Sequence, residues 1–243
     1  MVSASLPKFL RNGDNIQIPV TIKTNLALDL SGQATLQLTD PVKKTSVDGW
    51  FNNVFPVQYF TASSETPAKL HFLLTVPDSF KTSAQLHIIS TSGLMSDTMQ
   101  KIVPVFYHDH NIATTKKDFD VKKMLYKKSG KIITAVTGST DVFAGDTLVV
   151  KLIVTSAKSY AGVTLTDPLA ATMKTFHLPS NYKLTGADVV IPIQNLQKGQ
   201  RFFSYPVIAE HAGRFSFAPV IIKAGAVTES FDPGFILRVE PKE

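Results

Sequence analysis

The sequence predicts an all-β protein built from two tandem immunoglobulin- or fibronectin-III-like antiparallel β-sandwiches. Apolar and polar side chains alternate along many short segments, which is the period of a half-buried strand. The 14 prolines and 13 glycines fall mostly between these segments. A pair of turn motifs also recurs in the same order in both halves of the chain. About seven short strands per half, separated by frequent turns, are typical of a β-sandwich.

The first half of the chain shows the clearest alternation. Every second residue from Ile16 to Ile22 is apolar, with polar residues or proline between them. The same period returns in 34–38, 70–76 and 86–88, and turn-forming residues bound each segment. We therefore expect one face of each strand to be buried. The core residues that this phase predicts are Ile18, Val20, Leu36, Leu38, Phe72 and Leu74.

Strand patterns resume in the second half, and no convincing amphipathic helix interrupts them. The expected strands are 131–136, 148–155, 163–166, 201–209, 215–223 and 235–239. Their phase predicts a second core, which contains Val150, Leu152, Leu165, Tyr205 and Phe217. Because the side-chain period of a strand is two, a phase error of one residue would expose most of either set.

An internal repeat divides these strands into two units. Gly13-Asp14 precedes the first long strand of one unit, and Gly145-Asp146 precedes that of the other. In each unit the next strand ends in an aspartate-proline pair, at Asp40 and Asp167. Glycine can adopt a positive φ before a strand, and proline ends a strand because it has no amide hydrogen. The shared order predicts two copies of one architecture.

The predicted domains are 1–106 and 129–243, joined by a lysine-rich linker over 107–128. From Tyr107 to Lys131 there are seven lysines and three aspartates, and hydrophobic alternation stops. Within this stretch, the sequence of residues 118–126 fits either a short helical turn or an edge strand. The stretch from Lys116 to Lys131 could bind an acidic partner, or it could be a soluble tether.

Composition excludes several classes of protein. With no cysteine the chain has no thiol nucleophile, no thiolate zinc site and no disulfide. It lacks a run of about 18 apolar residues, so no membrane span is expected. The start is neither basic nor apolar, so either the chain is cytoplasmic or its export signal lies outside these residues. The net charge of +6 is concentrated in the lysine-rich stretch and lacks interleaved aromatics, so no nucleic-acid partner is expected.

Motifs for catalysis are also missing, so no enzyme, catalytic residue or cofactor is predicted. The one metal-like cluster is His108-Asp109-His110, which could close on zinc in a metal hydrolase. On an extended segment, however, the two histidines share a face while Asp109 points away. A solvated linker without metal is the expected reading.

Four aspartates at strand ends could be imagined as calcium ligands: Asp14, Asp40, Asp146 and Asp167. Calcium needs six to eight converging oxygens, whereas these residues occur singly beside glycine or proline. We expect them to form turns.

The densest aromatic group comprises Trp50, Phe51, Phe55, Tyr59 and Phe60. If exposed, it would offer a platform for a sugar or a peptide. Core packing is expected, because apolar aromatics are usually inside and only Trp50 and Tyr59 carry polar atoms.

Ordered motifs in the first unit resemble a known family. The opening is Leu6-Pro7-Lys8-Phe9-Leu10-Arg11-Asn12-Gly13-Asp14, followed by the alternating strand and Thr24-Asn25. Later motifs are Val57-Gln58-Tyr59-Phe60-Thr61, Leu74-Thr75-Val76-Pro77, Ser96-Asp97 and Val103-Pro104-Val105. Their order is similar to that in macroglobulin-like domains of bacterial alpha-2-macroglobulins, with Lys8 in place of the usual arginine.

The second unit resembles a region near the C-terminus of the same family. Its matching residues are Tyr126, Gly130, Gly145-Asp146, Asp167-Pro168-Leu169-Ala170-Ala171, Gly213-Arg214-Phe215 and Pro219. In the family a large helical domain, often with a thioester made from Cys-Gly-Glu-Gln, separates the two regions. Here only about twenty residues lie between them, without any cysteine. Covalent trapping of proteases therefore does not carry over.

The resemblance implies a structural and interaction module of an alpha-2-macroglobulin-like protein, located in the periplasm, at the cell surface or outside the cell. Such a module contributes to endopeptidase inhibition only within a larger assembly, and its partners are the rest of that assembly or proteases. The alternative is an adhesin-like, carbohydrate- or peptide-binding sandwich of a cell-surface protein, which would use exposed aromatics around Trp50.

Overall fold

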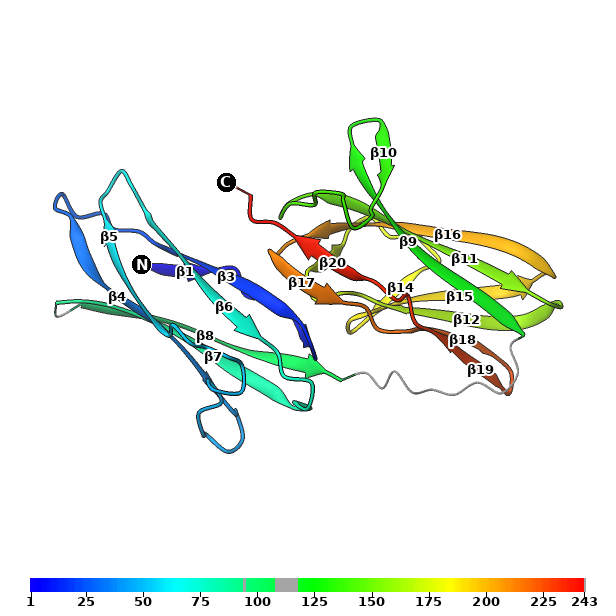
Figure 1. Cartoon of the computed structure of the whole chain (residues 1–243), viewed down its shortest axis with the longest axis horizontal. Helices are drawn as coiled ribbons and strands as arrows, with labels where there is room; N and C mark the ends of the chain where they lie inside the picture. Colours follow the sequence, from blue (N-terminus) through cyan, green and yellow to red (C-terminus); the bar gives the residue numbers. More distant parts are fainter. Residues whose placement is uncertain (94, 108–117, 243) are drawn as a thin grey trace. The chain divides into compact units, whose positions relative to one another are not determined.

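The computed structural model describes residues 1–93, 95–107 and 118–242, and all regular elements in these ranges are β-strands (Figure 1). The all-β prediction is thus confirmed. The chain divides into two compact units, Met1–Tyr107 and His108–Glu243. Within the described ranges, no helix is long and apolar enough to cross a membrane.

The first unit is a sandwich of two sheets. One sheet contains β1 (Val2–Ala4), β3 (Asn15–Ile22) and β6 (Ala68–Thr75), with β3 in the middle. The other has the order β2 (Leu10–Arg11), β8 (Met95–Phe106), β7 (Ser83–Ser92), β4 (Leu30–Thr39) and β5 (Val57–Ala62). Pairing is antiparallel except between β2 and β8, which run parallel. Strand β1 thus pairs with β3 in one sheet, and strand β2 pairs with β8 in the other.

The second unit repeats this plan on a larger scale. One sheet has the order β10 (Ile132–Ala135), β9 (Phe119–Ser129), β11 (Thr147–Ser156), β16 (Gly199–Ala209) and β13 (Met173–Thr175). The other has the order β14 (Lys183–Thr185), β15 (Asp188–Leu196), β12 (Tyr160–Pro168), β18 (Val220–Ala224) and β19 (Val227–Phe231). A further pair joins β17 (Gly213–Ser216) to β20 (Ile236–Val239).

The predicted phase of the strands is confirmed in both units. Every residue of the two predicted cores is buried: Ile18, Val20, Leu36, Leu38, Phe72, Leu74, Val150, Leu152, Leu165, Tyr205 and Phe217. The reason is that alternate side chains of a strand point to opposite faces, so that one face of each sheet can be wholly apolar.

The internal repeat is visible in the pairing of the strands. In the first unit β3 pairs with β6, and β4 lies between β5 and β7, which pairs with β8. In the second unit β11 pairs with β16, and β12 lies between β15 and β18, which pairs with β19. The strands that follow the two Gly-Asp motifs therefore hold the same place in each sandwich.

The Gly-Asp motifs form the same turn in each unit. Gly13 has a φ of 80° and Gly145 a φ of 93°, a region that favours glycine. The carboxylate of Asp14 accepts a hydrogen bond from the backbone amide of Arg11 at 2.9 Å. The carboxylate of Asp146 accepts one at 2.8 Å from the amide three residues before it. The turn role predicted for these two aspartates is confirmed.

Two sequence-based expectations were wrong in detail. Most of the second half of the predicted linker 107–128 is strand β9, which pairs on one side with β10 and on the other with β11, so it is not an edge strand. Lysines had masked its alternation, yet Phe119, Val121 and Leu125 point inward. The predicted strand 215–223 is divided between β17 and β18; Pro219, which has no amide hydrogen, lies in the break.

Candidate functional site

Three polar side chains form a network inside the second unit. Lys123 comes from β9 and Asp167 from β12, which belong to different sheets of the sandwich. The Lys123 Nζ lies 2.6 Å from Asp167 Oδ1, and both side chains are 0% exposed. Tyr205, from β16, donates its hydroxyl hydrogen to Asp167 Oδ2 at 2.5 Å. The ion pair therefore joins the two sheets across the core.

The register of the strands places these charges inside. Lys123 occupies an inward position of β9, between Val121 and Leu125 in the buried set. Asp167 continues the buried set of β12 that begins at Val163. Each residue replaces an apolar side chain at a core position, and the sequence holds this signal. Sequence reasoning missed it because the lysine was taken as linker and the aspartate as a turn former.

The surroundings of the pair compensate part of the cost of burying charge. Lys123 Nζ also donates to the carbonyl oxygen of Pro168 at 3.2 Å. It lies 4.5 Å from the centre of the Phe217 ring, within the range of a cation–π contact. Burial, followed by the neighbouring Asp167 charge, raises the pKa of Tyr205 well above its ordinary value. Its phenol therefore stays protonated and remains a hydrogen-bond donor at neutral pH.

Asp167 thus corrects the expectation that all four strand-end aspartates form turns. Asp40, at the equivalent position of the first unit, does form one: its Oδ1 accepts hydrogen bonds from the amides of Val42 and Lys43 at 2.8 and 2.9 Å. Those two backbone hydrogen bonds, the one from Lys43 first, lower the pKa of Asp40. The same dipeptide therefore has two roles, set by whether its aspartate faces the core.

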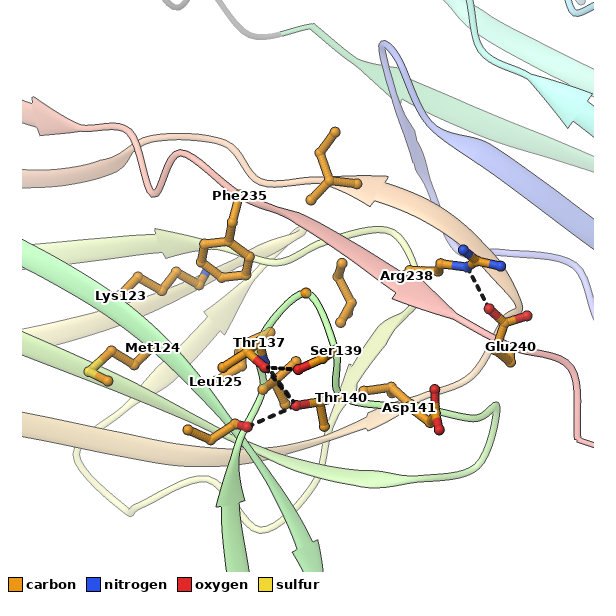
Figure 2. A pocket seen from close by; sticks show the side chains of 16 residues that line it. Lys123, Met124, Leu125, Thr137, Ser139, Thr140, Asp141, Phe235, Arg238 and Glu240 are labelled. Atoms are coloured by element: carbon orange, nitrogen blue, oxygen red, sulfur yellow. Dashed lines mark hydrogen bonds and ion pairs between the residues drawn. The ribbon is translucent and has the colours of Figure 1, made fainter.

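A cavity of about 700 Å³ lies beside the network (Figure 2). Residues 123–125 of β9 line it, and residues 135–142, 235–238 and Glu240 supply the rest of its lining. The hydroxyls of Thr137, Ser139 and Thr140 are hydrogen-bonded to one another on one wall (Figure 2). Lys123 borders this cavity, but its side chain is 0% exposed, so the ion pair itself stays out of solvent.

The part of the chain that the structure describes contains no candidate metal site. No three histidine, aspartate or glutamate side chains among residues 1–93, 95–107 and 118–242 are placed to hold an ion. The sequence cluster His108-Asp109-His110 lies outside the described residues.

The aromatic group around Trp50 divides between core and surface. Phe51 and Phe60 are buried as expected. Core packing was wrong for the other three, because Trp50 is 62% exposed, Phe55 76% and Tyr59 80%. Tyr59 occupies an outward position of β5, so the strand period itself puts it in solvent. The surface therefore carries aromatic side chains that a ligand could contact.

The lysines of the lysine-rich stretch that the structure describes lie in different environments. Lys123 is in the core, and Lys127 Nζ lies 2.7 Å from Asp146 Oδ2 in a pair with side chains 24% and 21% exposed. Lys122, Lys128 and Lys131 are exposed. A uniform soluble tether is therefore excluded for the described part of this stretch.

Comparisons with known proteins were made at the level of sequence and at the level of structure. No family model and no curated protein matches the sequence. Similar solved structures include Escherichia coli alpha-2-macroglobulin from domain MG7 to the C-terminus, at 10% identity and a TM-score of 0.45, over 89% of this chain and 34% of that one. A Salmonella alpha-2-macroglobulin mutant matches at 11% identity and a TM-score of 0.46, over 90% of this chain and 14% of that one.

A further match is trypsin-activated Escherichia coli alpha-2-macroglobulin, at 12% identity and a TM-score of 0.45, over 87% of this chain and 15% of that one. The chain thus spans about a third or less of the length of these proteins. The class that the fold defines is a tandem β-sandwich module.

Proposed function

We propose that the chain is a structural and interaction module of an alpha-2-macroglobulin-like protein and contributes to endopeptidase inhibition only within a larger assembly. The observation that carries the proposal is the order of the family-like motifs along both units, together with the structural use of their residues. Periplasmic or extracellular location and protein partners belong to the same proposal.

The opening motif supports a role as scaffold because its residues build the sandwich. Leu10 and Arg11 form β2, which pairs with the end of β8. The guanidinium of Arg11 is buried and lies 5.2 Å from the centre of the Phe9 ring and 5.8 Å from that of Phe106. Cation–π contacts of this kind are strongest when desolvated. These contacts hold the N-terminal segment against the sheet that contains β8.

The buried network also favours a structural role over catalysis. A catalytic group must reach its substrate, whereas the side chains of Lys123 and Asp167 have no solvent exposure and Tyr205 is 1% exposed. Their hydrogen bonds join strands of the two sheets. We therefore assign no enzymatic activity to this network.

A second candidate function, a carbohydrate- or peptide-binding module, is favoured by one observation: the exposure of Trp50, Phe55 and Tyr59. Aromatic faces in solvent are the surface on which sugar rings and extended peptides stack. The two candidates differ in whether these side chains contact a ligand.

The fluorescence of Trp50 separates the two candidates, because it is the one tryptophan in the chain. We expect emission typical of an exposed indole. For a scaffold, titration with neutral oligosaccharides or with unstructured peptides should leave the emission unchanged. A saturable change that the Tyr59→Ala variant abolishes would contradict the scaffold proposal and support the binding module. Tyr59→Ala should fold normally, since the side chain is 80% exposed.

A further inference from the structure

We propose that Lys123 and Asp167 condense to an intramolecular amide, an isopeptide bond between Lys123 Nζ and Asp167 Cγ that links the two sheets of the second unit. The bond would be a self-catalysed modification of the folded chain. It rests on the geometry of the buried network and not on the function proposed above.

The reacting groups are already held together. Lys123 Nζ is 2.6 Å from Asp167 Oδ1, and the carboxyl carbon is bonded directly to that oxygen. Near-attack geometries have reacting atoms about 3–3.5 Å apart, and such fixed proximity is worth effective concentrations of about 10⁵–10⁸ M. The two strands come from different sheets and cannot drift apart without unfolding the core. Proximity is therefore permanent in the folded state.

The pair also lies out of water, with both side chains 0% exposed. An ammonium and a carboxylate in contact lose the hydration that stabilises their charges. Transfer of one proton from Nζ to Oδ1 gives a neutral amine and a neutral acid, and the amine is then a nucleophile. Phe217, whose ring centre is 4.5 Å from Nζ, helps to exclude water from the pair.

The step balances without any co-reactant. The amine attacks Cγ, and negative charge develops on Oδ2, to which the Tyr205 hydroxyl already donates a hydrogen bond at 2.5 Å. The Cγ–Oδ1 bond then breaks, and Oδ1 leaves as water with two of the three protons of the original ammonium. The third stays on the new amide nitrogen. Tyr205 thus has the role of an oxyanion donor.

The site fits the product as well as the reactants. The amide N–H can donate to the carbonyl oxygen of Pro168, which is 3.2 Å from Nζ. The amide oxygen, the former Oδ2, keeps its hydrogen bond from Tyr205. Condensation replaces two buried charges by one neutral group whose hydrogen-bonding partners are in place, so the desolvation penalty of the ion pair disappears.

A neighbouring ion pair provides a matched control. Lys127 lies four residues, or two strand periods, further along β9, and its Nζ is 2.7 Å from Asp146 Oδ2. The distance is nearly the same, but the side chains are 24% and 21% exposed. Water reaches both side chains there, so that pair is not held in a dry site and should not condense.

The test is the intact mass of the fully denatured wild-type chain. We expect it to be lower than the sequence mass by one water, about 18 Da. Tryptic digestion should yield peptide 123–127 joined to peptide 159–174, with cleavage after Lys123 blocked. This map is needed because cyclisation of Asp48-Gly49 to a succinimide would lose the same mass. Lys123→Met and Asp167→Ala should abolish the joined peptide. Lys127→Met should retain the linkage, in a joined peptide that runs from 123 to 128 because the cleavage site at 127 is lost.

A wild-type chain of full sequence mass, with cleavage after Lys123 and separate peptides at 124–127 and 159–174, would overturn the proposal. Because this measurement is made on the wild type, it does not depend on whether a variant folds. Tyr205→Phe should form the bond more slowly, visible as a mixture of joined and separate peptides after short expression. Linkage as complete as in the wild type at the earliest times would overturn the role of Tyr205.

Discussion

Removal of the Lys123 ammonium should destabilise the second unit strongly. Lys123→Met keeps an unbranched apolar stem but leaves the Asp167 carboxylate in the core without its cation. Breaking a buried ion pair in this way costs about 3–5 kcal/mol. For a unit of this size each kcal/mol lowers the melting temperature by about 3 °C, so the transition should fall by about 10–15 °C. Any covalent link between the two residues would add to that loss.

The matched comparison is Lys127→Met on the same strand. Its ion pair with Asp146 has nearly the same length, 2.7 Å against 2.6 Å, but it is partly exposed. Pairs of this kind contribute about 0–1 kcal/mol. The difference between the two variants therefore measures the effect of burial, together with that of any covalent link between Lys123 and Asp167.

Calorimetry of the full chain is the assay, because the chain forms two compact units. Trp50 belongs to the first unit, so its fluorescence identifies the transition that should not move. The double variant Lys123→Met/Asp167→Leu removes both charges and should lose less stability than either single variant. Equal losses for Lys123→Met and Lys127→Met, or a double variant that loses the sum of the singles, would refute the reasoning.

Two further predictions follow from the packing. A Cβ at Gly32 would lie 2.1 Å from the backbone oxygen of Thr91, so Gly32→Ala should lose at least about 2 kcal/mol in urea unfolding of the first unit. Gly49→Ala, with open space around its Cβ, should change stability by less than about 1 kcal/mol, and equal effects would contradict the packing. The pKa of Tyr205 in the folded protein is raised well above 10, its value in the unfolded chain. The stabilising effect of the Tyr205 hydroxyl is therefore complete below about pH 10 and is lost as the pH rises through the pKa of the folded protein. The difference in melting temperature between wild type and Tyr205→Phe should therefore narrow above about pH 10, and a constant difference would show that the phenol is not buried beside Asp167.

Local periodicity was enough to predict several of the strands and which of their faces are buried. Ile18, Leu36 and Val150 are core residues because a period of two fixes their side, whatever the partner strand is. Strand β9 was missed because lysines on its outer face and Lys123 on its inner face hide the alternation. Trp50 was misplaced because it lies in a loop, where no period decides which side is solvent.

The network itself could not be predicted from neighbouring residues. Lys123 and Asp167 are 44 residues apart, and their contact depends on which strands of the two sheets face each other. Local sequence shows a charge at an inward position on each strand, and this is the signal to look for in a sandwich. Pairing of the two charges is a property of the tertiary fold, because a buried charge needs a partner from another element.

The central functional claim is that this chain is a scaffold module and that inhibition requires parts outside its 243 residues. The most direct measurement is a protease protection assay with the purified chain, in which several endopeptidases act on a large protein substrate and on a small peptide substrate. We expect both substrates to be cleaved at the rates seen without the chain. Stoichiometric protection of the large substrate alone, which is the sign of a trapped protease, would contradict the claim.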